Sequence, residues 1–154
     1  VIPLDQFHIH HGLKRTLRKA PFEIRNDTAL SEEMWGCADR KTTGISEESV
    51  TSYEKLFELG YAHTVECWVD DELVGGLYGI AIGGAFFGES MFSRKTDAAK
   101  VALVALVDRL RKNKFQLLDT QWTTDHLSRF GCIEVARHEY LRQLNQALLV
   151  TTKF

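Results

Sequence analysis

Three consecutive β-rich runs, joined by two very short turns, limit what this chain can fold into. The runs are His63–Val69, Leu73–Ile82 and Ala85–Met91. Asp70-Asp71 separates the first two and Gly83-Gly84 the last two, and such pairs are typical of the two-residue turns of β-hairpins. The sequence therefore predicts an antiparallel meander of three strands, which the rest of the fold must extend.

Helices and short strands are expected on either side of this meander along the chain. The expected helices are His8–Lys19, Ala29–Ala38, Ser46–Leu59, Thr96–Lys112, Thr124–Phe130 and Arg137–Leu149. The further expected strands are Phe22–Arg25, Gln116–Thr120 and Ile133–Val135. Thr28 and Ser46 are expected to cap the second and third helices. This order predicts an α+β fold with a mixed, mostly antiparallel sheet flanked by helices.

Composition narrows the class of protein. At 154 residues and 17.5 kDa, the chain is expected to form one domain, 1–154, with a sizeable core. The net charge of −2 carries no global nucleic-acid signal, so any RNA contact must come from a local patch. Three cysteines without a Cys-x-x-Cys pair indicate free thiols and argue against a zinc site. There is no signal-peptide pattern and no apolar run long enough to cross a membrane, which favours a cytoplasmic location.

Three polar side chains stand in otherwise apolar strand segments. Glu89 lies in a segment where a buried carboxylate would be costly without partners. It is either functional, or a rim residue paired with Arg94, or a residue on the solvent face. Asp119 and Gln121 are two apart at the end of an expected strand and should point to one face, where polar groups often line a ligand crevice. The alternative is a pair of strand-end capping groups.

A basic cluster and a run of histidines precede the first expected strand. Helical spacing gathers four cations on one face, where they could grip phosphates or simply form a solvated face: Lys14, Arg15, Arg18 and Lys19. His8, His10 and His11 have no carboxylate or thiolate at useful spacing, which argues against a metal site. Trp122 could be core or could stack on a base.

The long helix carries a broad apolar stripe that is core by default. It could also form one wall of an apolar pocket if Leu77, Phe86 and Met91 face it. The chain has no P-loop, no Gly-x-Ser-x-Gly, no His-Glu-x-x-His and no dinucleotide-binding glycine motif. The pyrophosphate signature of acetyltransferases is also missing, so the use of acetyl-CoA has no support.

Four segments stand in a specific order: Gly60–Trp68 (GYAHTVECW), Gly75–Gly79 (GGLYG), Gly88–Arg94 (GESMFSR) and Asp119–Gln121 (DTQ). As a set they resemble the leucyl/phenylalanyl-tRNA–protein transferase family, and the similarity extends from about Leu4 to Leu144. The resemblance implies an acetyltransferase-like (GNAT-like) fold, with which the α+β order is compatible.

The resemblance also implies roles for particular residues. Glu89 would hold the α-amino group of the aminoacyl moiety, and Asp119 and Gln121 would act on the incoming protein N-terminus and the ester carbonyl. Arg15, Arg18 and Lys19, beside Lys14, match residues that contact the tRNA acceptor stem. Seven residues match the family's pocket for a Leu or Phe side chain: Leu77, Phe86, Met91, Leu103, Leu106, Leu110 and Leu118.

The implied activity is transfer of Leu or Phe, with Met as a further candidate, from aminoacyl-tRNA to the N-terminus of an acceptor protein. The acceptors would carry N-terminal Lys or Arg, and the product would be marked for N-degron proteolysis. The implied partners are aminoacyl-tRNA and these acceptors, with no DNA and no membrane. Neither a metal nor a nucleotide cofactor is implied.

Departures from the family pattern leave a second hypothesis open. Residues 1–154 would be the catalytic domain without the family's upstream Trp-Trp and Pro-Arg segment. Gly44 stands where a Trp is usual, Thr120 where a Cys is usual, and His11 replaces a basic residue of the tRNA patch. The alternative is therefore a weakly active or inactive homologue that binds charged tRNA or a protein N-terminus.

Overall fold

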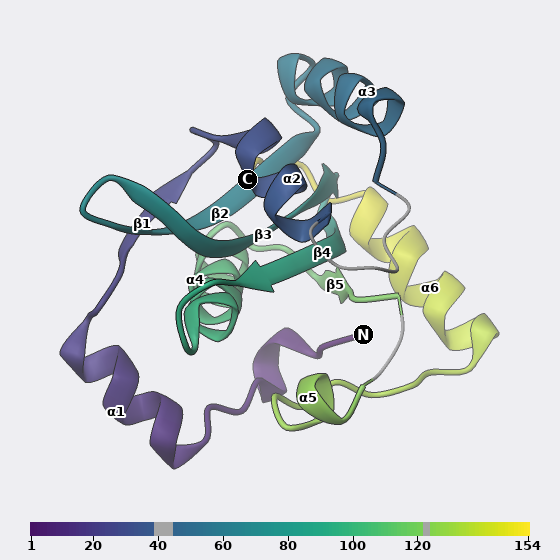
Figure 1. The fold of residues 1–154 in the computed structure, drawn as a ribbon. Coiled ribbons are helices and arrows are strands. Elements are labelled where there is room, and N and C mark those ends of the chain that lie inside the picture. Colours follow the sequence, from purple (N-terminus) through teal and green to yellow (C-terminus); the bar gives the residue numbers. More distant parts are fainter. Residues whose placement is uncertain (39–44, 122–123) are drawn as a thin grey trace.

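The computed structural model describes residues 1–38, 45–121 and 124–154. At its centre is a five-stranded sheet with the order β1-β2-β3-β4-β5 (Figure 1). The strands are β1 (Glu23–Asn26), β2 (Ala62–Val69), β3 (Glu72–Ile82), β4 (Ala85–Ser93) and β5 (Leu117–Asp119). Neighbours from β1 to β4 are antiparallel, and β5 runs parallel to β4. The expected α+β class and the mixed, mostly antiparallel sheet are confirmed.

Local turn chemistry explains both hairpins of the meander. Asp70 and Asp71 have φ values of 49° and 61°, the left-handed conformation that a tight two-residue turn requires. Gly83, with φ of 56°, begins the second turn, where glycine adopts this conformation at little cost. Both expected hairpins are therefore confirmed.

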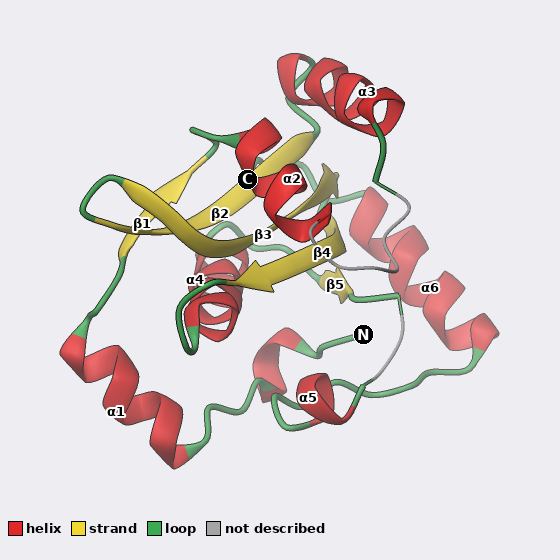
Figure 2. Ribbon diagram, in the orientation of Figure 1, coloured by secondary structure: helices red, strands yellow, loops and turns green. Residues whose placement is uncertain are grey.

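Helices cover both faces of the sheet (Figure 2). The helical elements are η1 (Leu4–Gln6), α1 (His11–Lys19), α2 (Leu30–Ala38), α3 (Glu47–Glu58), α4 (Ala98–Lys112), α5 (Asp125–Ser128) and α6 (Arg137–Leu148). Residues of α4 share one buried cluster with Leu77 of β3, whereas residues of α2 and α3 share another with the adjacent Tyr78. The sheet is thus buried from both sides, which accounts for its long apolar strands.

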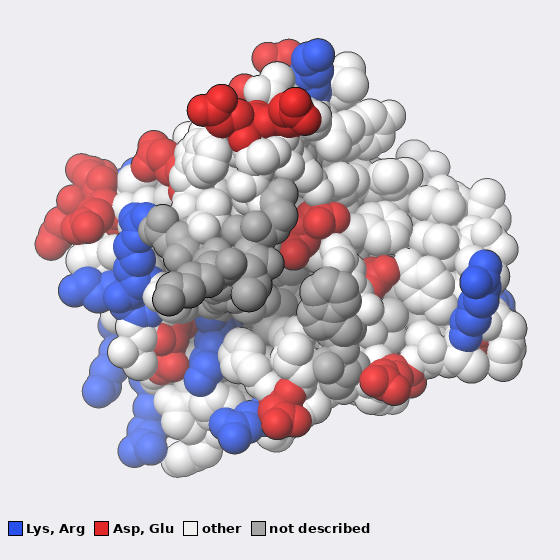
Figure 3. All heavy atoms as spheres, turned by 45° about the vertical axis from the view of Figure 1, so that its right-hand side comes forward, with Lys and Arg blue, Asp and Glu red and all other residues white. Residues whose placement is uncertain are grey.

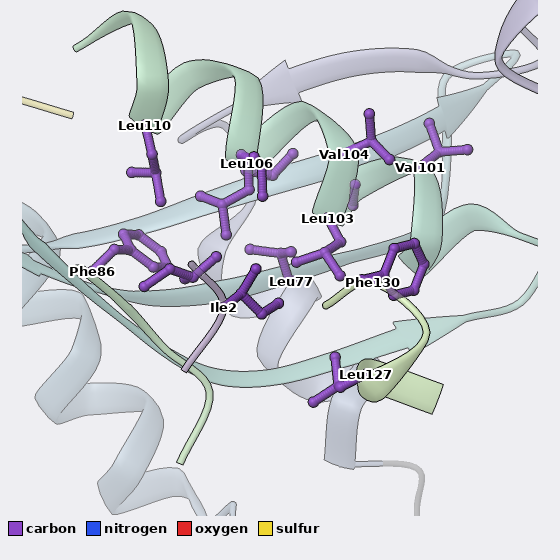
Figure 4. Close-up of a cluster of buried hydrophobic side chains, with 14 of the residues drawn as sticks. Ile2, Leu77, Phe86, Val101, Leu103, Val104, Leu106, Leu110, Leu127 and Phe130 are labelled. Atoms are coloured by element: carbon purple, nitrogen blue, oxygen red, sulfur yellow. The ribbon is translucent and has the colours of Figure 1, made fainter. Parts of the chain in front are cut away.

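The larger core lies between α4 and the sheet. Leu103, Leu106 and Leu110 point from α4 toward Leu77 and Phe86 of the strands (Figure 4). All five side chains are buried. Burying each contributes about 1.5–3 kcal/mol, so this face anchors the helix firmly on the sheet.

Several expected elements differ from the structure at their ends, such as the first helix, which begins at His11 rather than His8. Two local expectations differ by more than that. Residues 133–135 are not a strand; the Ile133 backbone instead exchanges hydrogen bonds with Val1, at 2.8 and 2.9 Å, beside the sheet. The start of α2 is held by Glu66 of β2, whose carboxylate accepts the backbone N–H groups of Thr28 and Ala29 at 3.0 and 2.9 Å. The Thr28 hydroxyl donates to Glu66 rather than capping its own helix. The expected Ser46 cap of α3 is confirmed by its bond from the Ser49 N–H.

Candidate active site

A cavity of about 560 Å³ lies between the β3–β4 hairpin, the start of α4 and α5. Its apolar wall includes Leu77 of β3, Leu103 and Leu106 of α4, and Leu118 of β5, each at most 3% exposed. Glu89 and Thr96 are among its exposed lining residues. A mostly apolar hollow of this size with a polar rim is typical of small-molecule sites.

The structure brings together most of the apolar residues that the resemblance places at a pocket. Those lining the cavity are Leu77, Met91, Leu103, Leu106 and Leu118. Phe86 and Leu110 lie instead in the core cluster, both 0% exposed. They support the wall from behind rather than facing the hollow.

Glu89 reaches the cavity because of an irregularity in β4. Gly79 pairs with Gly88 and Tyr78 pairs with Ser90, so Glu89 is the additional residue of a β-bulge. Bulges redirect a side chain and often occur beside functional sites. The carboxylate is consequently neither in the core nor in the regular alternation of the strand, but on the exposed rim.

Glu89 has an aromatic neighbour that the sequence patterns did not single out. Tyr53, on α3, lies near enough to Glu89 for the carboxylate to act on its hydroxyl. Burial raises the pKa of Tyr53, and the nearby negative charge of Glu89 raises it further. The Tyr53 ring also meets the edge of Tyr78 at a centroid distance of 5.4 Å. The carboxylate therefore has, on the α3 side, a neighbouring phenol that stays protonated.

Asp119 and Gln121 are adjacent, but not in the way that strand periodicity predicts. β5 ends at Asp119, and Gln121 has the left-handed φ of 71°. The Gln121 backbone N–H donates to Asp119 Oδ1 at 2.6 Å. The Gln121 Nε2 donates to the carbonyl oxygen of Gly88 at 3.3 Å, and Gly88 lines the cavity. The prediction that both lie on one strand is wrong, yet the pair sits next to the bulge that carries Glu89.

The basic helix α1 stands beside the same cavity. Lys14, Arg15, Arg18 and Lys19 are all exposed. On the helix, Thr16 Oγ1 donates to Asp97 Oδ2 at 3.1 Å, and Asp97 lines the cavity. Lys and Arg side chains gather at the lower left of Figure 3, the side on which α1 lies in Figure 1. A positive surface therefore adjoins the rim.

A further cation lies closer to the hollow. Lys100, in the first turn of α4, lines the cavity with its Nζ 3.6 Å from Asp97 Oδ1. The Asp97 carboxylate therefore contacts both Lys100 and Thr16 of α1.

One of the histidines near the N-terminus, His10, has a structural role. His10 Nδ1 accepts the Leu13 backbone N–H at 3.1 Å and so caps α1. Among the described residues, no group of three or more His, Cys, Asp or Glu is placed to hold a metal ion. Trp122 and Gly44 lie outside the described residues.

The sequence of this chain matches a known family of enzymes. The model of the family described as leucyl/phenylalanyl-tRNA protein transferase matches residues 1–145. The chain belongs to this family of enzymes. The transferase of Akkermansia muciniphila is 56% identical over 152 residues, covering 96% of this chain and 79% of the relative. That of Paramagnetospirillum magneticum is 54% identical over 158 residues, covering 100% of this chain and 76% of the relative.

Solved structures show the same fold at low sequence identity. An aminoglycoside acetyltransferase from an uncultured soil sample superposes with a TM-score of 0.56 at 12% identity, covering 78% of this chain and 95% of that one. A ribosomal-protein-alanine N-acetyltransferase from Brucella melitensis gives 0.53 at 16% identity, covering 75% and 92%. The acetyltransferase-like fold is therefore confirmed.

The sequence carries one signal for Tyr53, which is its place in an apolar stripe. Tyr53 occupies the apolar stripe of α3 with Val50 and Phe57, and all three pack in one cluster. A tyrosine in such a stripe carries a hydroxyl that usually finds a partner. The stripe predicts burial, but not that the partner is Glu89.

No helix in the described parts of the chain has the length and apolar character to cross a membrane.

Proposed function

We propose that this chain transfers Leu or Phe, with Met as a further candidate, from aminoacyl-tRNA to the N-terminus of a protein beginning with Lys or Arg. The added residue would mark that protein for degradation. The observation that carries the proposal is the apolar cavity with Glu89 on its rim and the Asp119–Gln121 pair beside it. Charged tRNA is a cytoplasmic substrate, so the reaction would take place there.

The cavity supplies the donor side. An aliphatic or aromatic aminoacyl side chain would enter between Leu77, Leu103 and Leu106, where removing it from water favours binding. Its ammonium group would then lie near the rim, within reach of the Glu89 carboxylate. Tyr53 lies beside that carboxylate and would help to position it for the ammonium group.

The reaction itself is aminolysis of an activated ester. The acceptor amine attacks the carbonyl carbon, a carbon–nitrogen bond forms, and the carbon–oxygen bond to the terminal ribose breaks. Overall the amine loses one proton and the ribose oxygen gains one. Asp119 and Gln121 would orient the amine and accept its hydrogen bond, which asks for positioning more than for strong acid–base catalysis.

The tRNA would approach over α1. The exposed cations of α1 lie beside the cavity rim, because Thr16 of the same helix bonds to Asp97 of the cavity lining. Backbone phosphates would be bound there mainly electrostatically. Because the net charge of the chain is −2, this attraction must come from the local cations of α1. Residues 1–154 would on this proposal contain the catalytic machinery.

One observation favours a second candidate, a weakly active or inactive homologue that binds charged tRNA or a protein N-terminus. By the resemblance, Gly44 would stand where the family usually has a tryptophan, so an aromatic stacking surface for the terminal adenosine would be lost. Binding through α1 and the cavity would remain, while turnover would fall.

The test is incubation with Leu-, Phe- and Met-tRNA and peptides that begin with Lys, Arg, Asp or Glu, read by peptide mass. We expect a mass increase of one residue on the Lys and Arg peptides only. An N-acetylated Lys peptide is the control, because its amine is blocked. Binding of charged tRNA without product would favour the second candidate, and neither binding nor product would overturn both.

A further inference from the structure

Tyr140 of α6 makes a short hydrogen bond to the Asp119 carboxylate. Its hydroxyl donates to Asp119 Oδ2 at 2.5 Å, while the other oxygen, Oδ1, accepts the Gln121 N–H at 2.6 Å. Gln121 then donates through Nε2 to the Gly88 carbonyl on the cavity wall. A continuous series of hydrogen bonds thus runs from α6 to the cavity.

The tyrosine ring is well placed to act as a fixed donor. It packs against the small buried cluster of Ala85, Leu117 and Ala147, where α6 meets β4 and β5. Burial raises its pKa to about 12, and the bond to Asp119 contributes to this rise. The hydroxyl therefore remains protonated at neutral pH and keeps donating to the carboxylate.

The two bonds hold Asp119 from opposite sides. A carboxylate bonded through only one oxygen can rotate about its terminal torsion, which is broad for this side chain. With both oxygens engaged, Oδ1 stays aimed at the Gln121 backbone. That matters because Gln121 has a φ of 71°, a conformation that a non-glycine residue rarely adopts without support.

We propose that Tyr140 is a positioning residue of the transfer reaction, acting through Asp119 on the placement of Gln121. This inference depends on the proposed function, because it assigns Tyr140 to the same reaction. No sequence pattern distinguishes Tyr140 from the other residues of its amphipathic helix. Its role depends on the packing of α6 beside the end of β5.

Tyr140→Phe is a clean probe, because it keeps the packed ring and removes only the hydroxyl. We expect kcat to fall by about tenfold or more, since a hydrogen bond to a charged group is lost, with KM for aminoacyl-tRNA changed less than about twofold. Tyr61→Phe is the matched control, since it removes a hydroxyl from an exposed ring just before β2. It should leave kcat unchanged.

A double-mutant cycle separates positioning from general stability. In an Asp119→Asn background, Tyr140→Phe should change kcat by less than about twofold, because the group it acts through has already been altered. A merely structural role would lower the melting temperature and reduce kcat equally in both backgrounds. Independent effects in the two backgrounds would overturn the proposal.

A readout that needs no turnover distinguishes this inference from the proposed function. The Gln121 amide proton, observed by NMR, should shift upfield and exchange faster in Tyr140→Phe than in Tyr61→Phe, because its acceptor becomes mobile. If wild-type protein shows no transfer, the proposed function fails and the reaction role of Tyr140 with it, whatever the amide does. If wild-type protein transfers and Tyr140→Phe matches it in kcat and amide shift, only the positioning role fails.

Discussion

Glu33 of α2 points at the backbone of Gly76 in β3, where an added Cβ would lie 2.6 Å from Glu33 Oε1. Glu33 is 0% exposed, and within the described residues neither carboxyl oxygen has a hydrogen-bond partner. Burial raises its pKa to about 9, the charge of Glu66 raises it further, and Arg94 opposes the shift. A carboxyl group that is neutral at pH 7 is therefore packed between helix and sheet, where glycine leaves room for it.

This raised pKa makes the stability of the fold depend on pH. The folded state holds the Glu33 proton more tightly than the unfolded state, whose pKa is near 4.5. Its contribution is thus fully present below about pH 4.5 and is lost as the pH rises through about 9. Glu33→Met has no such proton to lose. Its free energy of unfolding, relative to that of the wild type, should therefore be about 1–4 kcal/mol higher at pH 8 than at pH 5.

Urea unfolding at both pH values measures this difference. Glu32→Gln is the matched control, because Glu32 is the preceding residue on α2 and is exposed. It should leave the pH dependence as in the wild type. An identical pH dependence in Glu33→Met and wild-type protein would show that Glu33 is not the responsible group.

Gln121→Ala should lower turnover far more than it weakens tRNA binding, if Gln121 serves the aminolysis step. Alanine is strained at a φ of 71°, so Gln121→Gly, which removes the side chain without that strain, should show the same kinetic defect. Single-turnover transfer and tRNA binding measure the two quantities. Gln116→Ala, at an exposed position before β5, is the control. Equal losses in turnover and binding would make Gln121 structural.

Leu103→Phe should shift the donor preference toward smaller aminoacyl groups. Leu103 lines the cavity and is 1% exposed, so a larger ring must take space from the ligand. The discrimination between Phe- and Leu-tRNA should change by about 1–3 kcal/mol, measured as the ratio of their kcat/KM values. Leu141→Phe, on the exposed side of α6, should leave the ratio unchanged. An unaltered ranking of Leu, Phe and Met donors in Leu103→Phe would remove this residue from the site.

Arg15→Ala combined with Arg18→Ala should weaken the salt dependence of tRNA binding. Losing two phosphate contacts should flatten the slope of log affinity against log salt by roughly 1.5 units. The fold should survive, because both side chains are exposed on α1. Arg111→Ala with Lys112→Ala removes two exposed cations from the far end of α4 and is the control. If both double variants keep the wild-type slope, the basic face of α1 is only solvated.

The sequence by itself determined the elements whose causes are local. Hairpin turns at Asp70-Asp71 and Gly83-Gly84 follow from backbone preferences, and the amphipathic stripe of α4 follows from its periodicity. The resemblance carried by the four segments determined the family in advance, and with it the acetyltransferase-like fold.

Only the tertiary structure decided how the site is oriented. The bulge that aims Glu89 depends on how β4 pairs with β3, and the left-handed Gln121 depends on the Asp119 carboxylate. The same holds for Tyr53 and Tyr140, whose helices are brought to the site from distant parts of the chain. The alternation of residues 133–135 predicts a strand, yet these residues form none, and the Ile133 backbone bonds to Val1 beside the sheet. Periodicity describes one element at a time, whereas these contacts arise between elements, so no local pattern encodes them.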